Sequence, residues 1–349
     1  MSIHRYRAAK VWGMVLVAFA IVLTLLCVLG VRGHLPGIQR LVSKPVADPS
    51  PHRSGKVAVH GVHIHYLDWG GTGTALIFIP GFGSSAHIFD DFAPRFVDQF
   101  RAVAITRVGF GESDQPESGY DLASRIEQIR MVLDSLGITR AVLVGHSLGG
   151  DELTGFAGAY PERTASLVYL DAACDHVKAL EWEDVLARFA VGGPEPSSAD
   201  LAGADAYQDW IEHVRGVRFP VGEVLATMRF DGAGAVVGSR TADRVIEATR
   251  AAVQHPDYER VHAPALALFS DWETAADFIP WLRADPAKNT RATAVLRKKV
   301  LPEALAERAR FLREVKGAQG LALPSHHYNF LSHPDEVERR MRAFLASLP

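Results

Sequence analysis

The stretch of the 349-residue chain that points most clearly to chemistry is Ala141-Val-Leu-Val-Gly-His-Ser-Leu-Gly-Gly150. It contains Gly145-x-Ser147-x-Gly149, between an apolar run and a helix-forming segment. A turn in this strand–turn–helix setting is so tight that a side chain at either glycine would collide with neighbouring backbone. Ser147 is then held in a strained conformation with its hydroxyl exposed, at the positive end of the following helix. We therefore predict that Ser147 is a nucleophile rather than part of an ordinary turn.

Two more glycine-rich segments accompany Ser147, and with them the chain resembles the α/β-hydrolase superfamily over roughly residues 57–349. Ile79-Pro-Gly-Phe-Gly-Ser-Ser85 is similar to the family's oxyanion loop, and Thr106-Arg-Val-Gly-Phe-Gly-Glu-Ser113 is similar to its R-x-G-x-G-x-S turn. The resemblance assigns the oxyanion hole to the backbone N–H groups of Phe82 and Leu148, each contributing on the order of 3 kcal/mol. Pro80 replaces a frequent His of the family, and we expect little effect because backbone groups bind the oxyanion.

A serine nucleophile needs a general base, and the chain offers 15 histidines. The stretch Pro324-Ser-His-His-Tyr-Asn-Phe-Leu-Ser-His-Pro334 resembles the family's histidine loop, in which the base lies four residues before a Leu and seven before a Pro. That register selects His327, with His326 as the competitor, and we expect His333 to be solvated. An imidazole titrates near pH 6.5, so it can accept the serine proton and return it to the leaving group.

The acid that orients the histidine has more than one candidate. Asp171 closes the apolar run Leu167-Val-Tyr-Leu-Asp171, a position that carries the acid in some relatives, including a subset of haloalkane dehalogenases. Glu273 falls three residues after Ser270, where the commonest family pattern has Gly followed by x-x-Asp, and Asp271 is a third option. We prefer Asp171 and keep Glu273 as the alternative, although Asp171 could instead cap a helix and Glu273 could be merely solvated.

Short apolar runs separated by helical patterns predict the elements that carry these residues. Such runs are typical of a parallel sheet that is buried on both faces, so the fold class is α/β, with a mostly parallel central sheet flanked by helices. We expect an antiparallel hairpin at the sheet edge over 57–66 and a final helix over 335–348. The five predicted buried strands are Ala75–Ile79, Ala102–Ile105, Ala141–Val144, Leu167–Leu170 and Ala265–Phe269.

About ninety residues between Asp171 and Pro264 contain helical patterns and scattered aromatic residues but no clear buried strand. Segments of this length are lids or separate modules, so we predict a helical cap over the carboxyl edge of the sheet. Most of its aromatic side chains should fill the cap's own core, and one or two should face the pocket. The predicted core is 57–174 and 263–349, and the cap is 175–262.

The N-terminal region predicts a membrane anchor. Residues 11–31 form 21 consecutive residues without a charge, enough for a helix to span a bilayer. A basic N-terminus (1–10) precedes them, and a proline-containing linker (32–56) follows. We expect a single-pass anchor with the catalytic domain on the extracytoplasmic side, or secretion if the segment is a cleaved signal peptide.

Charge and cysteine content exclude several classes of protein. The first 44 residues hold six of the 37 Lys and Arg residues and no acid, which leaves 31 basic against 40 acidic residues in the remainder. Such an acidic domain is a poor nucleic-acid binder. Two cysteines cannot build a disulfide framework, and no Cys/His spacing indicates a zinc site.

These patterns and the resemblance together predict a serine hydrolase that cleaves an ester or related acyl substrate through an acyl-enzyme, without metal or organic cofactor. Serine at position 147 argues against haloalkane dehalogenase and epoxide hydrolase activity, because those relatives use Asp there. The alternatives are a carbon–carbon bond hydrolase with the same triad and a non-catalytic ligand receptor on the same fold. We expect a small-molecule substrate, with membrane contact through the N-terminal helix.

Overall fold

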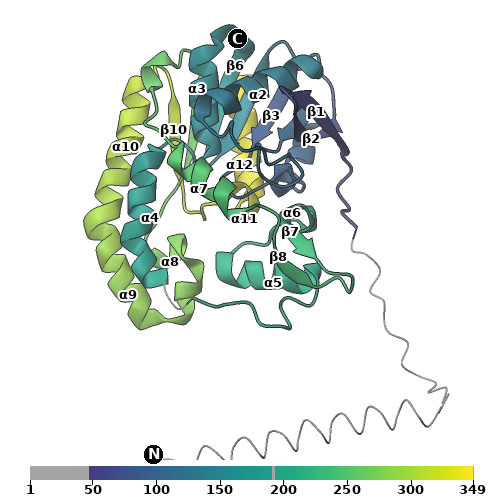
Figure 1. Cartoon of the computed structure of the whole chain (residues 1–349). Coiled ribbons are helices and arrows are strands. Elements are labelled where there is room, and N and C mark those ends of the chain that lie inside the picture. The colour runs from purple at the N-terminus through teal and green to yellow at the C-terminus, as the bar shows by residue number, and fades with distance from the viewer. Residues whose placement is uncertain (1–46, 191–192, 349) are drawn as a thin grey trace, which may run out of the picture. The chain divides into compact units, whose positions relative to one another are not determined.

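The computed structural model describes residues 47–190 and 193–348, and an eight-stranded sheet forms their centre (Figure 1). The strand order is β1-β2-β4-β3-β5-β6-β9-β10. β2 runs antiparallel to both β1 and β4, and the other neighbouring strands are parallel. The strands are β1 Arg53–Val59, β2 Val62–Gly70, β3 Ala75–Ile79, β4 Arg101–Ile105, β5 Ala141–His146, β6 Thr164–Leu170, β9 Ala265–Ser270 and β10 Gln319–Leu323.

The five predicted buried strands are confirmed as β3, β4, β5, β6 and β9, and the predicted edge hairpin as β1 and β2. All residues of β3, β5 and β9 are buried, as expected for strands covered on both faces. The sequence analysis did not predict β10, the strand at the other edge. Its first four residues are exposed or half-buried, so it lacks the continuous apolar run that identified the others.

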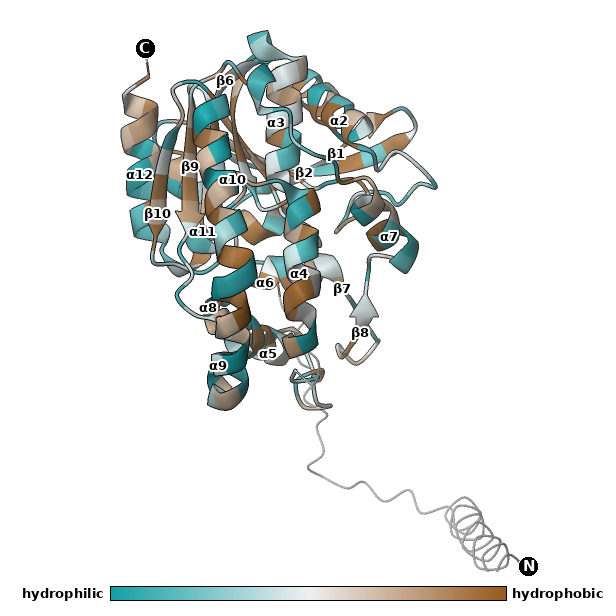
Figure 2. Cartoon of the chain, turned by 90° about the vertical axis from the view of Figure 1, so that its left-hand side faces the viewer, coloured by the Kyte–Doolittle hydropathy of each residue, from teal (hydrophilic) through white to brown (hydrophobic). Residues whose placement is uncertain are grey.

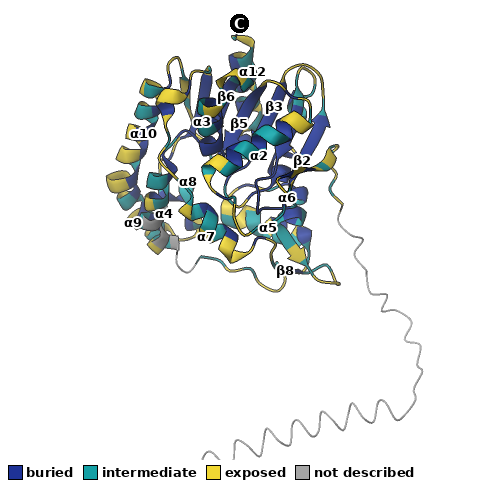
Figure 3. Ribbon diagram, turned by 45° about the horizontal axis from the view of Figure 1, so that its top comes forward, coloured by how far each residue is buried: buried dark blue, intermediate teal, exposed yellow. Residues whose placement is uncertain are grey.

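Helices cover both faces of the sheet, and the strands between them are buried (Figure 3). Alternate strand residues pack on α2, α3 and α10 on one face. The opposite face packs on α11, α12 and the short 3₁₀-helices after β3. The predicted final helix is confirmed as α12. The bounds are α2 Leu122–Ser135, α3 Gly149–Ala159, α10 Leu301–Glu314, α11 Asn329–Ser332 and α12 Pro334–Ala346.

The long segment after β6 forms helices and one small hairpin, and a second helical excursion follows β9. The first contains α4 His176–Ala190, α5 Ala204–Arg215, α6 Val221–Thr227, the pair β7 Met228–Phe230 and β8 Val236–Ser239, and α7 Asp243–Ala251. The second contains α8 Ala275–Phe278 and α9 Pro286–Val295.

The second excursion lies within the range 263–349, which the sequence analysis assigned to the core. It lies beside α4 (Figure 2). Trp182 and Leu186 of that helix form one apolar cluster with Trp272 and Leu296. Helices from both sides of β9 therefore share one core. A hydrophobic pattern along one chain segment does not reveal such a contact.

The predicted anchor at 11–31, the basic N-terminus and most of the linker lie outside the described residues. Among the helices that are described, none is both long enough and apolar enough to cross a bilayer.

Candidate active site

Ser147 lies in a sharp turn between β5 and α3, where its backbone φ is +49°. A Cβ atom at Gly145 would lie 2.8 Å from the Gly149 carbonyl oxygen, and one at Gly149 would lie 2.5 Å from the Ile79 carbonyl oxygen. The predicted crowding around the two glycines is therefore present. Ser147 is the only residue of 145–149 that is not fully buried, so the turn presents its hydroxyl while the glycines allow close packing.

Two unpaired backbone donors occur at the positions that the family resemblance indicates. The N–H groups of Phe82 and Leu148 donate to no acceptor within residues 47–190 and 193–348. Leu148 is the N-cap residue of α3, so its N–H lies at the positive end of that helix. Gly81, beside Phe82, lies so close to Ser147 that a Cβ there would be 3.0 Å from the serine Cβ. Both donors are thus near the serine and free to bind an anionic oxygen.

His327 and Asp171 are hydrogen-bonded, with 2.8 Å between His327 Nδ1 and Asp171 Oδ2. His327 lies in the loop after β10, and Asp171 directly follows β6. The Asp171 side chain is 9% exposed and that of His327 is 30% exposed. A carboxylate accepts the Nδ1 proton, so Nε2 keeps its lone pair free to act as a base.

Among the described residues, no hydrogen bond joins Ser147 Oγ to His327, whose Nδ1 faces Asp171. His146, the residue before Ser147, nevertheless shows that His327 lies close to the turn. The rings of His146 and His327 have centroids 4.7 Å apart, and His146 Nε2 lies 3.1 Å from the His327 carbonyl oxygen. Because a carbonyl can only accept, His146 Nε2 carries the proton. His146 thus links the serine turn to the histidine loop, a contact that the sequence analysis missed.

The loop after β9 supports Asp171. The backbone N–H of Ser270 donates to Asp171 Oδ1 at 2.8 Å, so both carboxylate oxygens are engaged. Glu273, the alternative acid, is exposed, and its backbone N–H donates to Asp277. Asp271 is exposed and lies 3.4 Å from Arg308. The structure therefore brings Asp171 to His327 and leaves the two other carboxylates apart from it.

The neighbouring histidines have other environments. His326 Nδ1 accepts a hydrogen bond from the Tyr328 backbone N–H at 3.1 Å, and His333 is exposed and contacts Ser332. Burial, with His327 nearby, lowers the pKa of His326 to about 3. Burial, followed by the proximity of His327, also holds the pKa of His146 well below its usual range. Both rings are therefore neutral at physiological pH.

A buried arginine holds the oxyanion loop in place. Arg107 donates to the carbonyl oxygens of Pro80 and Gly81 at 2.8 and 2.9 Å, and to Glu152 of α3 at 2.5 Å. Arg125 of α2 reaches the same oxygen of Glu152 at 3.0 Å. Burial opposes ionisation of Glu152, but the two guanidinium groups outweigh it and lower the pKa of this carboxyl. The arginine of the R-x-G-x-G-x-S turn thus supports the loop that carries Phe82.

The cap contacts the same loop. Ser85 donates its hydroxyl to Glu223 Oε2 at 2.5 Å and its backbone N–H to both oxygens of that carboxylate at 3.1 Å. Glu223 belongs to α6, and burial raises its pKa to about 7. Among the cap aromatics, Phe219 packs on Tyr328 with 4.8 Å between ring centroids. Phe219 thus lies next to the histidine loop.

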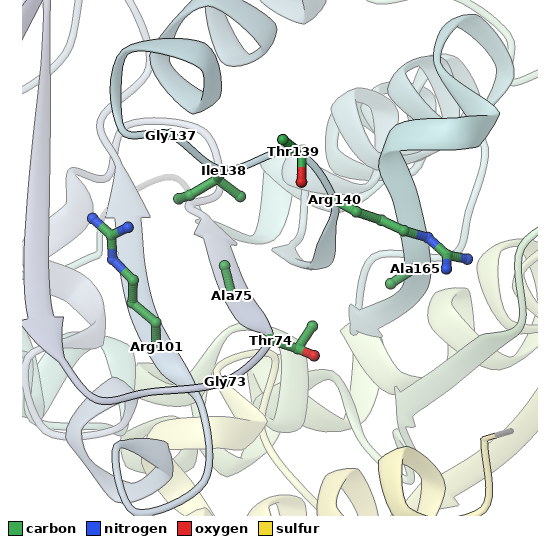
Figure 4. Close-up of a pocket in the computed structure, with 9 residues that line it drawn as sticks. All are labelled: Gly73, Thr74, Ala75, Arg101, Gly137, Ile138, Thr139, Arg140 and Ala165. Carbon is green, nitrogen blue, oxygen red and sulfur yellow. The ribbon is translucent and has the colours of Figure 1, made fainter.

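A cavity of about 300 Å³ lies at the amino ends of the parallel strands, opposite to the carboxyl ends that carry Ser147 and Asp171 (Figure 4). It is lined by Ala75 at the start of β3, by Arg101 at the start of β4 and by the turn 137–140 before β5. Figure 4 shows the guanidinium groups of Arg101 and Arg140 pointing away from one another. This cavity therefore has no convergent charge and is separate from the carboxyl edge of the sheet, where Ser147 and Asp171 lie.

Comparison with known proteins identifies the fold. Residues 74–194 match the family model of the alpha/beta hydrolase fold. The chain is 34% identical over 101 residues to 2-(acetamidomethylene)succinate hydrolase of Mesorhizobium japonicum, covering 29% of this chain and 36% of that protein. It is 38% identical over 117 residues to a 2-hydroxy-6-oxononadienedioate/2-hydroxy-6-oxononatrienedioate hydrolase of Paraburkholderia phymatum, covering 31% and 40%.

A solved structure of E-2-(acetamidomethylene)succinate hydrolase aligns with 85% of this chain and 100% of its own, with a TM-score of 0.65 and 19% identity. The sequence matches span little more than a third of each curated relative. The described residues have the fold of the α/β hydrolases, and the sequence matches the model of that family over residues 74–194.

The described residues that have the geometry of metal ligands gather around His87, not around Ser147. Asp48, His52 and Asp90 form one group with it, and His65 and Glu112 form another.

Proposed function

We propose that the protein is a serine hydrolase that cleaves an ester or a related acyl bond. The observation that carries this proposal is the hydrogen bond between His327 Nδ1 and Asp171 Oδ2 at 2.8 Å, beside a turn that presents Ser147 at positive φ. The carboxylate selects the tautomer of His327 that accepts a proton at Nε2. The free N–H groups of Phe82 and Leu148 supply the second requirement, a site for the oxyanion.

The proposed reaction has two halves. Ser147 Oγ attacks the carbonyl carbon of the substrate while its proton passes to His327 Nε2, and the oxyanion accepts hydrogen bonds from Phe82 and Leu148. The carbon–oxygen bond to the leaving group then breaks, and the leaving alcohol takes the proton from His327. Water attacks the acyl-enzyme with His327 as the base, which releases the acid and regenerates Ser147. Asp171 stabilises the imidazolium in both halves.

Hydrolysis of a carbon–carbon bond in a diketone-type substrate is the second candidate. Its support is the 38% identity over 117 residues to a 2-hydroxy-6-oxononadienedioate/2-hydroxy-6-oxononatrienedioate hydrolase. The same three side chains would serve, with a carbanion equivalent as the leaving group. The serine esterase remains the principal proposal, and substrate tests distinguish the two candidates because both use the same side chains.

A panel of p-nitrophenyl esters of increasing chain length tests the principal proposal on the full chain in mild detergent. We expect turnover with at least one ester and its loss in Ser147→Ala. Ser135→Ala is the matched control, because Ser135 is an exposed serine at the end of α2 that contributes no group to the triad or to the oxyanion loop. A folded wild type that turns over no ester of any length would refute the esterase. Turnover of a ring-cleavage diketone by that protein would then favour the second candidate.

We further propose that residues 11–31 anchor the chain in a membrane, with the hydrolase on the extracytoplasmic side. The support is that these 21 residues are predominantly apolar and contain no charge. Protease added to intact cells should degrade the hydrolase of an anchored protein, whereas a cytoplasmic domain would be protected.

A further inference from the structure

Four side chains that commonly ligate metals converge outside the candidate active site. They are Asp48, His52, His87 and Asp90, and one ligand atom from each lies within 4.8 Å of all the others. Asp48 and His52 lie in the segment before β1, whereas His87 lies in the 3₁₀-helix Ala86–Phe89 and Asp90 follows it. Two pairs that are each close in sequence therefore meet in space.

The contacts among these four side chains leave several of their buried polar atoms without a hydrogen-bond partner within the described residues. His87 Nδ1 lies 2.9 Å from Asp90 Oδ2 and 3.0 Å from Asp48 Oδ2. An imidazole nitrogen has one N–H or one lone pair in the ring plane, so it can serve only one of these oxygens. Asp48 Oδ2 is buried and accepts no hydrogen bond. It lies 3.2 Å from His52 Nε2, which is also buried and unpaired within the described part of the chain.

Asp90 carries the more deeply buried of the two carboxylates in the cluster. Its side chain is only 2% exposed, and its Oδ1 has no partner within the described residues. A carboxylate so deeply buried requires a compensating cation or a full set of hydrogen-bond donors. Asp48 lies beside Asp90, so two carboxylates share a single nitrogen of His87, Nδ1.

We propose that Asp48, His52, His87 and Asp90 bind a divalent transition-metal ion of the zinc type. Two imidazole nitrogens and two carboxylate oxygens are ligands that zinc accepts, and two carboxylates balance the charge of the ion. The contacts of 2.9, 3.0 and 3.2 Å are close to the edge of about 3.3 Å expected between ligands at about 2.0 Å from a tetrahedral ion. Calcium and magnesium prefer sites made of oxygen alone, so they fit less well.

The residues around these four side chains are also arranged as expected around a metal site. Glu112 Oε2 lies 3.6 Å from His87 Nε2, the nitrogen that does not face the cluster, as is typical of a carboxylate behind a ligating histidine. A Cβ at Gly222 of α6 would lie 2.3, 2.6 and 2.7 Å from the ligand atoms of Asp90, Asp48 and His87, so only glycine fits there. The ion would join the segment before β1 to the end of the oxyanion loop, beside the cap helix α6.

Zinc binding by the full chain, purified without a histidine tag, tests this site. After loading with zinc and removal of free ion, we expect one zinc per chain by elemental analysis and a higher melting temperature than in the chelated protein. The double variant Asp48→Asn/His52→Ala should lose more than about 100-fold in affinity, because even outer-shell partners of a metal contribute 10–100-fold. His63→Ala is the matched control, since His63 forms an exposed pair with Asp114 at 2.9 Å and should leave zinc binding unchanged.

Two measurements keep the test decisive. If the double variant unfolds, cobalt added to the wild type should give the intense visible bands of a four-coordinate ion, and weak six-coordinate bands would overturn the proposal. Equal zinc content in the wild type and in a folded double variant would also overturn it, as would a wild type that retains none. Covalent labelling of Ser147 is a separate readout, so the failure of the zinc site and the failure of the serine hydrolase are distinguishable.

Discussion

Ser147 and Asp171 share an uncommon backbone conformation, with φ of +49° and +47°, at the carboxyl ends of neighbouring parallel strands. The residues before them, His146 and Leu170, are register partners in β5 and β6. A non-glycine residue in this region is strained, and such residues cluster where the surrounding structure holds a side chain for function. The two strands therefore end in two strained residues side by side, one with a hydroxyl and one with a carboxylate.

The place of Asp171 in this pair leads to the first prediction. Asp171→Asn should lower kcat on the best ester substrate by about 10⁴-fold, because an amide favours the wrong tautomer of His327. The measurement is steady-state kinetics, with circular dichroism to verify folding. Glu273→Gln is the control, since that side chain is exposed and should leave kcat unchanged. A large loss in the control with little effect at Asp171 would reverse the assignment of the acid.

The packing around Gly149 leads to the second prediction. Gly149→Ala would place a Cβ 2.5 Å from the Ile79 carbonyl oxygen and so displace the start of the oxyanion loop. We expect the free energy of unfolding to fall by about 1–3 kcal/mol, as for other overpacked sites, and kcat to fall with it. Gly203→Ala, at a position with open space around it, should change stability by less than about 0.5 kcal/mol in the same denaturation experiment. Equal effects at both glycines would contradict the close packing.

Arg107 gives a third prediction, on stability. Arg107→Met would leave Glu152 without its closest cation and the carbonyls of Pro80 and Gly81 without their donor. Breaking a buried ion pair from one side typically costs about 3–5 kcal/mol, which urea denaturation would measure. Arg339→Ala removes an exposed contact to Glu336 and should cost less than about 1 kcal/mol. A small loss for Arg107→Met would mean that the pair does not hold the oxyanion loop.

The buried neutral histidines predict how stability depends on pH. The pKa of His326 is lowered from its usual value to about 3, so between about pH 6.5 and 3 the unfolded chain binds a proton that the folded chain excludes. Stability should therefore fall as the pH drops below about 6.5. At pH 5 the contribution of His326 is at most about 2 kcal/mol.

His326→Asn tests this dependence, because Asn keeps an acceptor for the Tyr328 N–H but does not titrate. The decrease in melting temperature between pH 7 and pH 5 should be smaller in this variant than in the wild type. His333→Asn is the control, since His333 is exposed and should leave the decrease unchanged. An identical decrease in wild type and His326→Asn would contradict a neutral His326 in the folded chain.

Much of this site was predictable from sequence because its parts follow local rules. The tight turn at Ser147 requires glycines at fixed positions, and buried parallel strands require continuous apolar runs, so both are visible in the sequence. The position of Asp171 at the end of such a run made it a candidate. The register of the histidine loop predicted His327, but spacing alone did not decide which carboxylate reaches it, because 156 residues separate Asp171 from His327.

The remaining features depend on contacts between distant segments. β10 is an edge strand with few buried residues, so it has no apolar run that would identify it. The excursion after β9 packs on α4 only in three dimensions. The His87 cluster combines two short pairs that have no zinc-type Cys/His spacing, so the sequence analysis found no metal site.

Covalent labelling of Ser147 tests the proposed serine chemistry most directly. The full chain is treated with a fluorophosphonate probe, and the modified peptide is identified by mass spectrometry. We predict stoichiometric labelling at Ser147, none in Ser147→Ala and much slower labelling in Asp171→Asn. A folded wild-type protein that remains unlabelled, or one labelled at another residue, would contradict the account and favour a ligand receptor on this fold.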